Sequence, residues 1–278
     1  MASSKKPVRH SGQHFLLDHQ LIRQIILQAD INRNHLVLDI GAGEGALTEP
    51  LSKVAGRVIA IEKDPGLVSC LKQMFANEPH VTILCKDAGT VKMPGKPFRV
   101  VSNIPYGLTT HLFGRLMDRP GSSSFAGGII VIEWGAAKRF TEAYHRNPRL
   151  IGWNTWFELN LVRKVKPACF SPPPRVDSAM VEIRRRERPA VHPKQSDKYL
   201  AFVATLLRRP EVVSSSALKS LFTRKQVQRI LADIGVIGSL PICQLDVTQW
   251  EHCFLLMDRL IPKQLHPRMP RKYRKWYR

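Results

Sequence analysis

The chain of 278 residues is long enough for one large domain, or for a large domain with a small one, and its 44% hydrophobic residues can form a substantial core. Its 43 Lys and Arg against 22 Asp and Glu give a net charge of +21, which is unfavourable in a compact protein that has no polyanionic partner. Nucleic acid is the first candidate partner and an acidic membrane surface the second, but no apolar stretch is long enough to span a bilayer.

The cysteines and the N-terminus indicate the compartment. Five cysteines stand singly, and no His or Cys cluster has the spacing of metal ligands, so we expect no metal site and a reducing environment. Residues 1–12 are polar and basic and no apolar segment follows them, which differs from a secretory signal. We therefore expect a cytoplasmic protein. Nothing in the sequence indicates an obligate oligomer, so a monomer is the expected state.

From residue 36 onward, short β-rich runs alternate with helical patterns. This alternation predicts a parallel sheet with helices on both faces. The expected strands are Leu36–Ile40, Arg57–Glu62, Val81–Cys85, Phe98–Asn103, Gly128–Ile132, Phe157–Val165 and Asp177–Arg184. The expected helices between the first five strands are Gly45–Ala55, Pro65–Phe75 and Thr109–Met117. Only a Pro-rich loop separates the last two strands, which we expect to form an antiparallel pair at one edge of the sheet.

The character of the chain changes after Arg188. Two prolines lie within residues 189–196, and the segments beyond have the pattern of short amphipathic helices: Tyr199–Leu207, Arg224–Ile234 and Thr248–Leu260. Residues 179–278 carry 20 Lys and Arg against 8 Asp and Glu, whereas residues 1–178 carry 23 against 14. We therefore expect a sheet-containing domain at residues 1–188 and a small, basic, helical domain at residues 189–278 that binds RNA.

The first expected strand, Leu36–Ile40, runs directly into a glycine-rich turn, Gly41–Gly45, and then into a helical pattern. Glycines are needed at such a turn because a side chain would keep a ligand away from the backbone. By itself the motif is compatible with NAD, another nucleotide or S-adenosylmethionine (SAM).

Two acidic residues follow at the ends of the next two strands. Glu62 lies roughly 20 residues after the glycines, where an acid binds ribose hydroxyls. Asp87 follows the third strand, at the edge where such sheets bind ligands, and its carboxylate suits an adenine amine. Either residue alone is equally explained as a helix N-cap. Both together, beside the glycine turn, favour a cofactor that contains adenosine.

The fourth strand ends in Asn103-Ile104-Pro105-Tyr106, which favours SAM over NAD. Methylation of an exocyclic amine needs hydrogen-bond acceptors that hold the nitrogen as it becomes tetrahedral. The Asn103 side-chain oxygen and the Ile104 carbonyl supply two, Pro105 fixes the turn, and Tyr106 offers a face on which a flipped-out adenine stacks. An ordinary Asn-x-Pro turn is the alternative interpretation. We expect direct methyl transfer from SAM to adenine N6, with the proton released to water.

These motifs resemble those of the rRNA adenine N6-methyltransferases, over residues 10–185. Gly12–Leu16 is similar to the segment that closes over SAM, Asp39–Gly45 to the glycine motif, and Phe170–Ser178 to a late loop whose aromatic residue packs near the target base. The resemblance implies an α/β fold, the Rossmann-like class I SAM-dependent methyltransferase fold. That fold has a seven-stranded, mostly parallel sheet, here with a small C-terminal all-α domain, so that residues 1–188 hold SAM and the catalytic site.

The resemblance also implies the site residues. The catalytic set is Asn103, Ile104, Pro105, Tyr106 and Phe170, with the two aromatic rings on either side of the base. The SAM-binding set is His14, Leu16, Gly41, Gly43, Glu62, Asp87 and Asn103. His14 and Gly107 depart from the family, in which many members have Asn at both positions.

Basic residues in both expected domains are predicted to contact phosphates, which position RNA without reading its sequence. They are Lys138, Arg139, Lys164 and Lys166 in the first domain and Arg208, Arg209, Arg224 and Lys225 in the second.

Within the family, Glu133–Phe140 and Trp153–Phe157 are similar to the erythromycin-resistance (Erm-type) group rather than to the small-subunit dimethyladenosine transferase (KsgA-type) group. This similarity implies methylation of an adenine in the peptidyl-transferase loop of 23S rRNA, which confers macrolide, lincosamide and streptogramin B resistance. A small-subunit rRNA dimethylase and a non-catalytic RNA-binding factor of the same fold are the alternatives. Trp153 and Trp156 themselves are better explained by core packing.

Overall fold

The computed structural model describes residues 14–276, so Gly12 and Gln13 of the expected N-terminal motif lie outside the described residues. Contacts divide the described chain into two compact units. The first unit comprises residues 14–113, Ser124–Thr141 and Leu159–Arg185, and the second unit comprises Gly114–Ser123, Glu142–Glu158 and residues 186–276. These units do not coincide with a division at residue 188, because the second unit also takes up two earlier segments.

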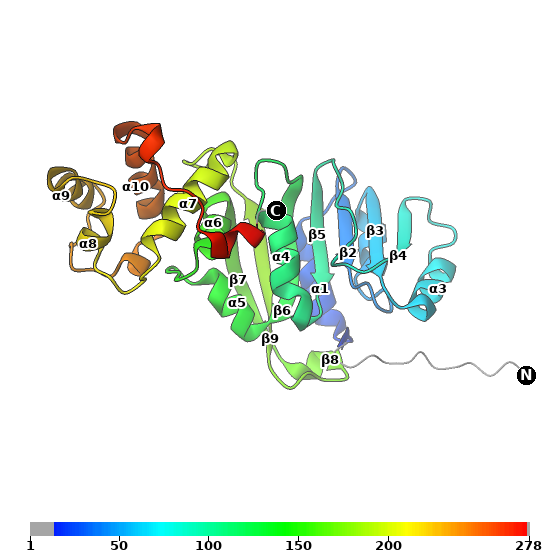
Figure 1. The fold of residues 1–278 in the computed structure, drawn as a ribbon. Coiled ribbons are helices and arrows are strands. Elements are labelled where there is room, and N and C mark those ends of the chain that lie inside the picture. The colour runs from blue at the N-terminus through cyan, green and yellow to red at the C-terminus, as the bar shows by residue number, and fades with distance from the viewer. Residues whose placement is uncertain (1–13, 277–278) are drawn as a thin grey trace, which may run out of the picture. The chain divides into compact units, whose positions relative to one another are not determined.

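A seven-stranded sheet runs in the order β4-β3-β2-β5-β6-β9-β7 (Figure 1). Its strands are β2 (Leu36–Ile40), β3 (Arg57–Glu62), β4 (Val81–Cys85), β5 (Phe98–Asn103), β6 (Phe125–Glu133), β7 (Phe157–Val165) and β9 (Ser178–Arg185). The strands from β4 to β6 are parallel, and β9 is antiparallel to β6. The predicted mostly parallel sheet is confirmed, with β7 and β9 together at one edge. A short antiparallel pair, β1 (Phe15–Leu16) and β8 (Phe170–Ser171), stands apart from it.

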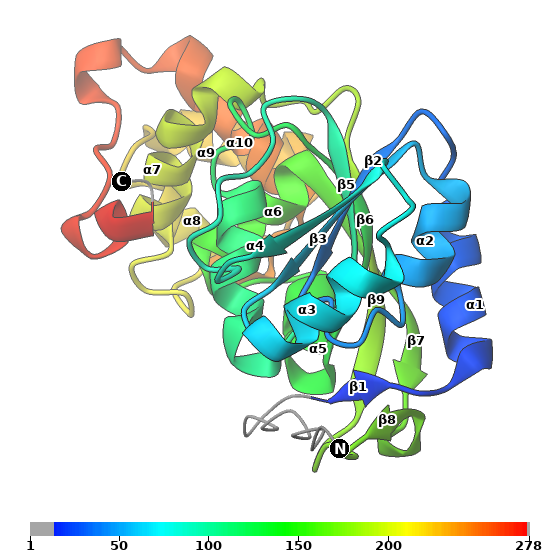
Figure 2. The ribbon, with the colours of Figure 1, turned by 90° about the vertical axis from the view of Figure 1, so that its right-hand side faces the viewer.

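Helices cover both faces of this sheet. Those of the first part of the chain are α1 (His19–Ala29), α2 (Thr48–Val54), α3 (Pro65–Met74), α4 (Thr109–Met117) and α5 (Trp134–Thr141). Figure 2 shows α1 and α2 on one side of the sheet and α5 on the other. Leu21 and Ile25 of α1 pack in one apolar cluster with Val37, Val58 and Val101 of three neighbouring strands. Such burial explains why the strands are near-continuous apolar runs.

The second unit is helical. It contains α6 (Pro148–Trp156), α7 (Ser196–Leu206), α8 (Ser214–Leu218), α9 (Arg224–Asp233) and α10 (Val247–Leu260). The 3-10 turns of the chain are η1 (Tyr106–Leu108), η2 (Pro167–Cys169), η3 (Pro193–Gln195), η4 (Ile242–Gln244), η5 (Lys263–Leu265) and η6 (Arg271–Trp276). Within residues 14–276, none of the helices has both the length and the apolar character needed to cross a membrane.

Buried side chains explain why the second unit takes up segments 114–123 and 142–158. The Arg149 guanidinium donates to both oxygens of Asp118, at 2.8 and 2.6 Å, and Trp153 Nε1 donates to one of them at 2.8 Å. Trp156 Nε1 donates to the carbonyl oxygen of Val191 at 2.9 Å. Both tryptophans are about 1% exposed, which confirms their interpretation as core residues. Because α6 is buried against α7, it belongs to the second unit, although it directly precedes strand β7 in the sequence.

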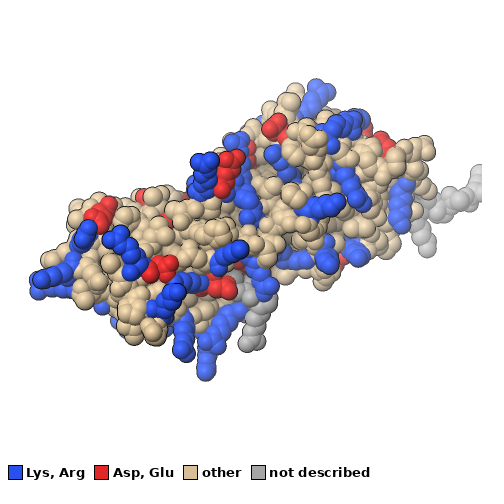
Figure 3. Space-filling model, turned by 90° about the horizontal axis from the view of Figure 1, so that it is seen from above, with Lys and Arg blue, Asp and Glu red and all other residues tan. Residues whose placement is uncertain are grey.

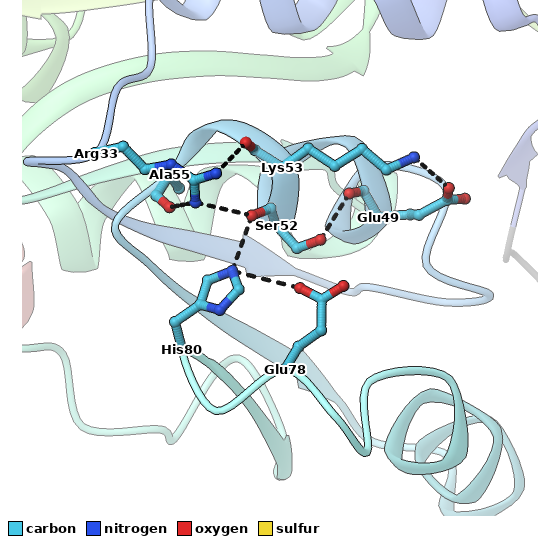
Figure 4. Close-up of polar contacts among 7 residues, drawn as sticks. All are labelled: Arg33, Glu49, Ser52, Lys53, Ala55, Glu78 and His80. Carbon is cyan, nitrogen blue, oxygen red and sulfur yellow. Dashed lines mark hydrogen bonds and ion pairs between the residues drawn. The ribbon is translucent and has the colours of Figure 1, made fainter.

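The glycine turn leads into α2, and Arg33 closes the other end of that helix (Figure 4). Its guanidinium donates to the carbonyl oxygens of Lys53, Ala55 and Ser52 at 2.7, 3.1 and 3.4 Å. His80 Nε2 donates to the same Ser52 oxygen at 2.8 Å. The last carbonyls of a helix have no partner within the helix, so these bonds replace water there.

We expect Arg33→Met to lower the free energy of unfolding by about 1–2 kcal/mol, because three helix-end carbonyls lose a charged donor. Urea denaturation followed by circular dichroism measures the change. Arg23→Met is the matched control, since Arg23 is an exposed arginine on α1. Equal unfolding midpoints for the two variants would contradict the capping role.

Candidate active site

A cavity of about 360 Å³ opens in the first unit where β2, β3, β4 and β5 end. This is the edge at which open parallel sheets bind ligands. Predicted site residues that line it are His14, Leu16, Gly41, Gly43, Glu62, Asp87, Asn103, Ile104, Pro105 and Tyr106. The structure therefore brings the two predicted sets together, with the exception of Phe170.

The glycine turn is shaped by backbone conformations that favour glycine. Gly41, Gly43 and Gly45 have φ angles of +78°, +56° and +92°. A Cβ on Gly43 would lie 2.9 Å from two ring carbons of Phe15, and one on Gly41 would lie 3.4 Å from Pro105 Cδ. The turn is therefore a tight cradle, and no side chain separates its glycine backbone from the cavity.

Glu62 is fixed at the end of β3 and is only 3% exposed. Its Oε2 accepts from Gly43 N at 3.0 Å, and its Oε1 accepts from Lys63 N and Asp64 N at 2.9 and 3.0 Å. Each carboxylate oxygen has more than one acceptor site, so the group can still receive ribose hydroxyls from the cavity. The same bonds tie the glycine turn to β3.

Asp39, Glu44 and Asp87 also line the cavity. Asp87 is exposed, and its Oδ1 accepts from Gly89 N at 2.6 Å. Asp39 is buried within β2 and accepts from Thr48 Oγ1 at 2.7 Å. Burial raises the pKa of Asp39 to about 7. Asp39 was not among the predicted site residues, although a carboxylate inside an apolar strand is itself a signal of a site.

The residues present fit SAM. The cradle at Gly41–Gly43 leaves room that a side chain would fill, and Glu62 and Asp87 line the same cavity with acceptors that would suit the ribose and adenine of such a cofactor. Acidic groups around the cavity also suit a cofactor with a sulfonium and an ammonium charge.

The turn after β5 presents its acceptors to the cavity. Asn103 Nδ2 donates to the carbonyl oxygen of His14 at 2.7 Å, which leaves the side-chain oxygen Oδ1 as the acceptor on the other side of the amide. Ile104 is buried, and its N–H donates to Val131 O at 3.1 Å. These bonds hold in place the Asn103 side chain and the Ile104 peptide that the sequence predicted as acceptors.

The Tyr106 ring is held by its hydroxyl, which shares a 2.6 Å hydrogen bond with Ser178 Oγ at the start of β9. Burial raises the pKa of Tyr106. The His14 ring lies beside it, with centroids 5.7 Å apart and planes inclined by 34°. Ser178 is the last residue of the late loop Phe170–Ser178, but no local pattern indicated that it positions Tyr106.

That Phe170 faces the target base stays a prediction, and the structure describes where its side chain lies. The side chain is 3% exposed, packs in an apolar cluster with Leu16 and Leu21, and does not line the cavity. The physical reason is the pairing of β1 with β8, which sets Phe170 opposite Leu16. Residues directly opposite in such a pair share a face, so Phe170 lies on the same face as Leu16, which is 5% exposed and borders the cavity.

His14 joins the N-terminal segment to two parts of the site. Its Nδ1 donates to the carbonyl oxygen of Pro172 at 2.7 Å, because a carbonyl oxygen only accepts. Its own carbonyl receives the Asn103 amide.

We expect His14→Asn to lower kcat/KM by about 2- to 10-fold, which corresponds to the loss of one exposed hydrogen bond. The loss is small because any residue at position 14 keeps the backbone carbonyl that accepts from Asn103. Steady-state kinetics with varied SAM measures the change. A loss beyond 100-fold would show that the imidazole itself acts on the substrate.

The eight basic residues predicted to contact RNA are all exposed. They fall in both units, and the face in Figure 3 shows many Lys and Arg side chains and few Asp and Glu. Among them, Lys164 has an ion-pair partner as well as a ring contact, since its Nζ lies 2.5 Å from Asp177 Oδ2 and 5.1 Å from the centroid of the Trp134 ring. Their contact with RNA stays a prediction.

Comparisons with known proteins identify the family. The family model described as ribosomal RNA adenine dimethylase matches residues 5–259. An rRNA adenine N-6-methyltransferase of Bacteroides fragilis is 40% identical over 96% of this chain and all of its own length. A probable ribosomal RNA small subunit methyltransferase A of Methanococcoides burtonii is 31% identical over 80% of this chain and 82% of its own length.

A solved structure shares the fold over nearly its whole length. The crystal structure of a 23S rRNA methyltransferase superposes with a TM-score of 0.79 at 27% identity, over 88% of this chain and 99% of that one. The fold class predicted from the sequence is confirmed. With the family model and the curated relatives, these matches establish the activity and its methyl donor. The chain belongs to the ribosomal RNA adenine dimethylase family and is a SAM-dependent rRNA adenine N6-methyltransferase.

Proposed function

We propose that the enzyme methylates N6 of one adenine in the peptidyl-transferase loop of 23S rRNA and thereby confers resistance to macrolides, lincosamides and streptogramin B. The observation that carries the proposal is the match to a 23S rRNA methyltransferase at a TM-score of 0.79 over 99% of that chain. The similarity of Glu133–Phe140 to the erythromycin-resistance group points to the same substrate. The enzyme acts as a monomer on RNA in the cytoplasm in this proposal.

The proposed chemistry uses groups already held in place. SAM supplies a methyl group on a sulfonium, which an amine can displace in line. Asn103 Oδ1 and the Ile104 carbonyl accept hydrogen bonds from N6 as positive charge develops on it. Tyr106, fixed through Ser178, stacks on the extruded base, which offsets about 1–3 kcal/mol of the cost of removing it from its neighbours. The amine loses its proton to water after transfer.

The 23S proposal is tested by primer extension and nucleoside mass spectrometry on rRNA from cells with and without the protein. We expect one methylated adenine in the peptidyl-transferase loop and growth at higher macrolide concentrations. Dimethylation of N6 blocks base pairing and produces a stop, and mass spectrometry detects one or two methyl groups. Cells that express Asn103→Ala are the control. Unmodified 23S rRNA together with unchanged macrolide sensitivity would contradict the proposal.

A small-subunit rRNA dimethylase is the second candidate, favoured by the 31% identity to a probable small subunit methyltransferase A. Purified enzyme assayed on protein-free 23S rRNA and on immature small subunits separates the two. Methyl transfer to small subunits alone would establish the second candidate.

A further inference from the structure

Beside the cavity lies a cluster of three side chains to which the proposed chemistry gives no role: Trp134, Lys164 and Asp177. Trp134 is the first residue of α5, half-buried, and it does not line the cavity. Lys164 Nζ lies over its ring, 5.1 Å from the centroid, and pairs with Asp177 at 2.5 Å. The backbone N–H of Trp134 donates to the Asp177 carbonyl at 3.0 Å, so that the cluster is anchored at both ends.

The cluster adjoins the residues that hold Tyr106. Glu133 of β6 is the register partner of Ser178 in β9, and Ser178 Oγ is bonded to the Tyr106 hydroxyl. Trp134 and Asp177 are the chain neighbours of that pair, since Trp134 directly follows β6 and Asp177 directly precedes β9. An RNA strand that places a base on Tyr106 therefore passes close to Trp134.

Exposure makes the cluster available to a ligand. The side chains of Lys164 and Asp177 are 49% and 32% exposed. An ion pair so exposed contributes little, because water competes for both partners. A phosphodiester carries one negative charge, as the Asp177 carboxylate does, and its exposed oxygens can replace Asp177 as the partner of Lys164 in so exposed a pair. The aromatic ring beneath offers a flat face of the kind on which bases stack.

We propose that Trp134 and Lys164 form a subsite for the nucleotide next to the methylated adenine, in which the indole ring stacks on the neighbouring base and Lys164 binds its phosphate. Extrusion of the target adenine removes a stacking partner from each neighbour, and Trp134 replaces one of them. Asp177 holds Lys164 in position over the ring until RNA arrives. The inference requires only an rRNA adenine substrate and is independent of which rRNA carries it.

The stacking contact is tested by steady-state kinetics of Trp134→Leu and Trp134→Phe on a protein-free transcript of whichever rRNA the enzyme methylates. We expect Trp134→Leu to raise KM for RNA about 5- to 100-fold, Trp134→Phe to restore most of the affinity, and the Kd for SAM to stay unchanged by calorimetry. Tyr144→Leu, at a 55% exposed aromatic, is the control and should leave KM unchanged. An unchanged KM for Trp134→Leu would overturn the proposal.

An RNA-side substitution makes the test specific. Transcripts with an abasic nucleotide on the 5′ or the 3′ side of the methylated adenine remove the proposed stacking partner. At one of the two positions, we expect the abasic nucleotide to raise KM for the wild-type enzyme but to change it less than twofold for Trp134→Leu. If the abasic nucleotide and Trp134→Leu raise KM by independent factors that multiply, and do so at both positions, the stacking role is overturned. If Trp134→Leu fails to bind SAM, Trp134→Phe replaces it in the comparison with the abasic transcripts.

The phosphate contact has its own readout. Lys164→Gln should lower the slope of log KM for RNA against log salt by about 0.7, which corresponds to one phosphate contact on a single strand. Lys53→Gln removes another exposed, ion-paired lysine, bonded to Glu49, and should leave the slope unchanged. Equal slopes for wild type and Lys164→Gln would remove Lys164 from the subsite. If 23S rRNA proves not to be the substrate, the same experiments run on the small-subunit transcript, so the two proposals fail separately.

Discussion

Replacement of Asn103 by alanine is expected to lower kcat on the order of 10²–10³-fold while the protein stays folded, because N6 loses an acceptor that is needed only as its charge develops. The effect should appear in kcat more than in KM for RNA, since the contact strengthens in the transition state. Single-turnover methyl transfer from labelled SAM at saturating RNA measures it.

Two variants separate the acceptor from the donor function of this amide. Asn103→Asp keeps side-chain oxygens as acceptors but loses the bond to the His14 carbonyl, so it should retain more activity than Asn103→Ala. Asn160→Ala, at an exposed position of β7, is the matched control and should behave as wild type. Normal turnover by Asn103→Ala and by Tyr106→Ala would refute the assignment of the catalytic site.

Glu62→Ala should abolish measurable SAM binding, with a rise in Kd of about 100-fold or more, and should also lower stability by about 2–3 kcal/mol. The ribose loses its acceptor, and three backbone N–H groups, those of Gly43, Lys63 and Asp64, lose the partner that orders the glycine turn. Isothermal titration calorimetry and thermal unfolding report the two effects.

The comparison variant is Glu142→Gln, an exposed glutamate on which we expect neither effect. Unchanged SAM affinity in a folded Glu62→Ala protein would place the cofactor elsewhere in the cavity. A loss of affinity without any loss of stability would show that the three backbone bonds are replaced by water.

The sequence was sufficient where local chemistry decides the outcome. The bounds of β2, β3, β4, β5 and β7 were predicted correctly. Central strands such as β2 and β5 are mostly buried apolar runs with clear limits, and the edge strand β7 begins with alternating buried and exposed residues. A related reason explains the prediction of the glycine turn, Glu62, Asp87 and the turn at Asn103. Each directly follows or ends a parallel strand, and topology alone then gathers them at one edge of the sheet.

Only the tertiary structure decided which distant segments meet. The register of β1 with β8 buries Phe170 beside Leu16, whereas the bond from Ser178 to Tyr106 and the Trp134–Lys164 contact form between residues far apart in the chain. Likewise, α6 belongs with α7 because a helix buried on nearly all sides joins the unit that covers it. Hydrophobic period, turn residues and charge are local properties that the sequence states directly. Strand register and the side on which a ring lies depend on long-range packing, and no local pattern encodes them.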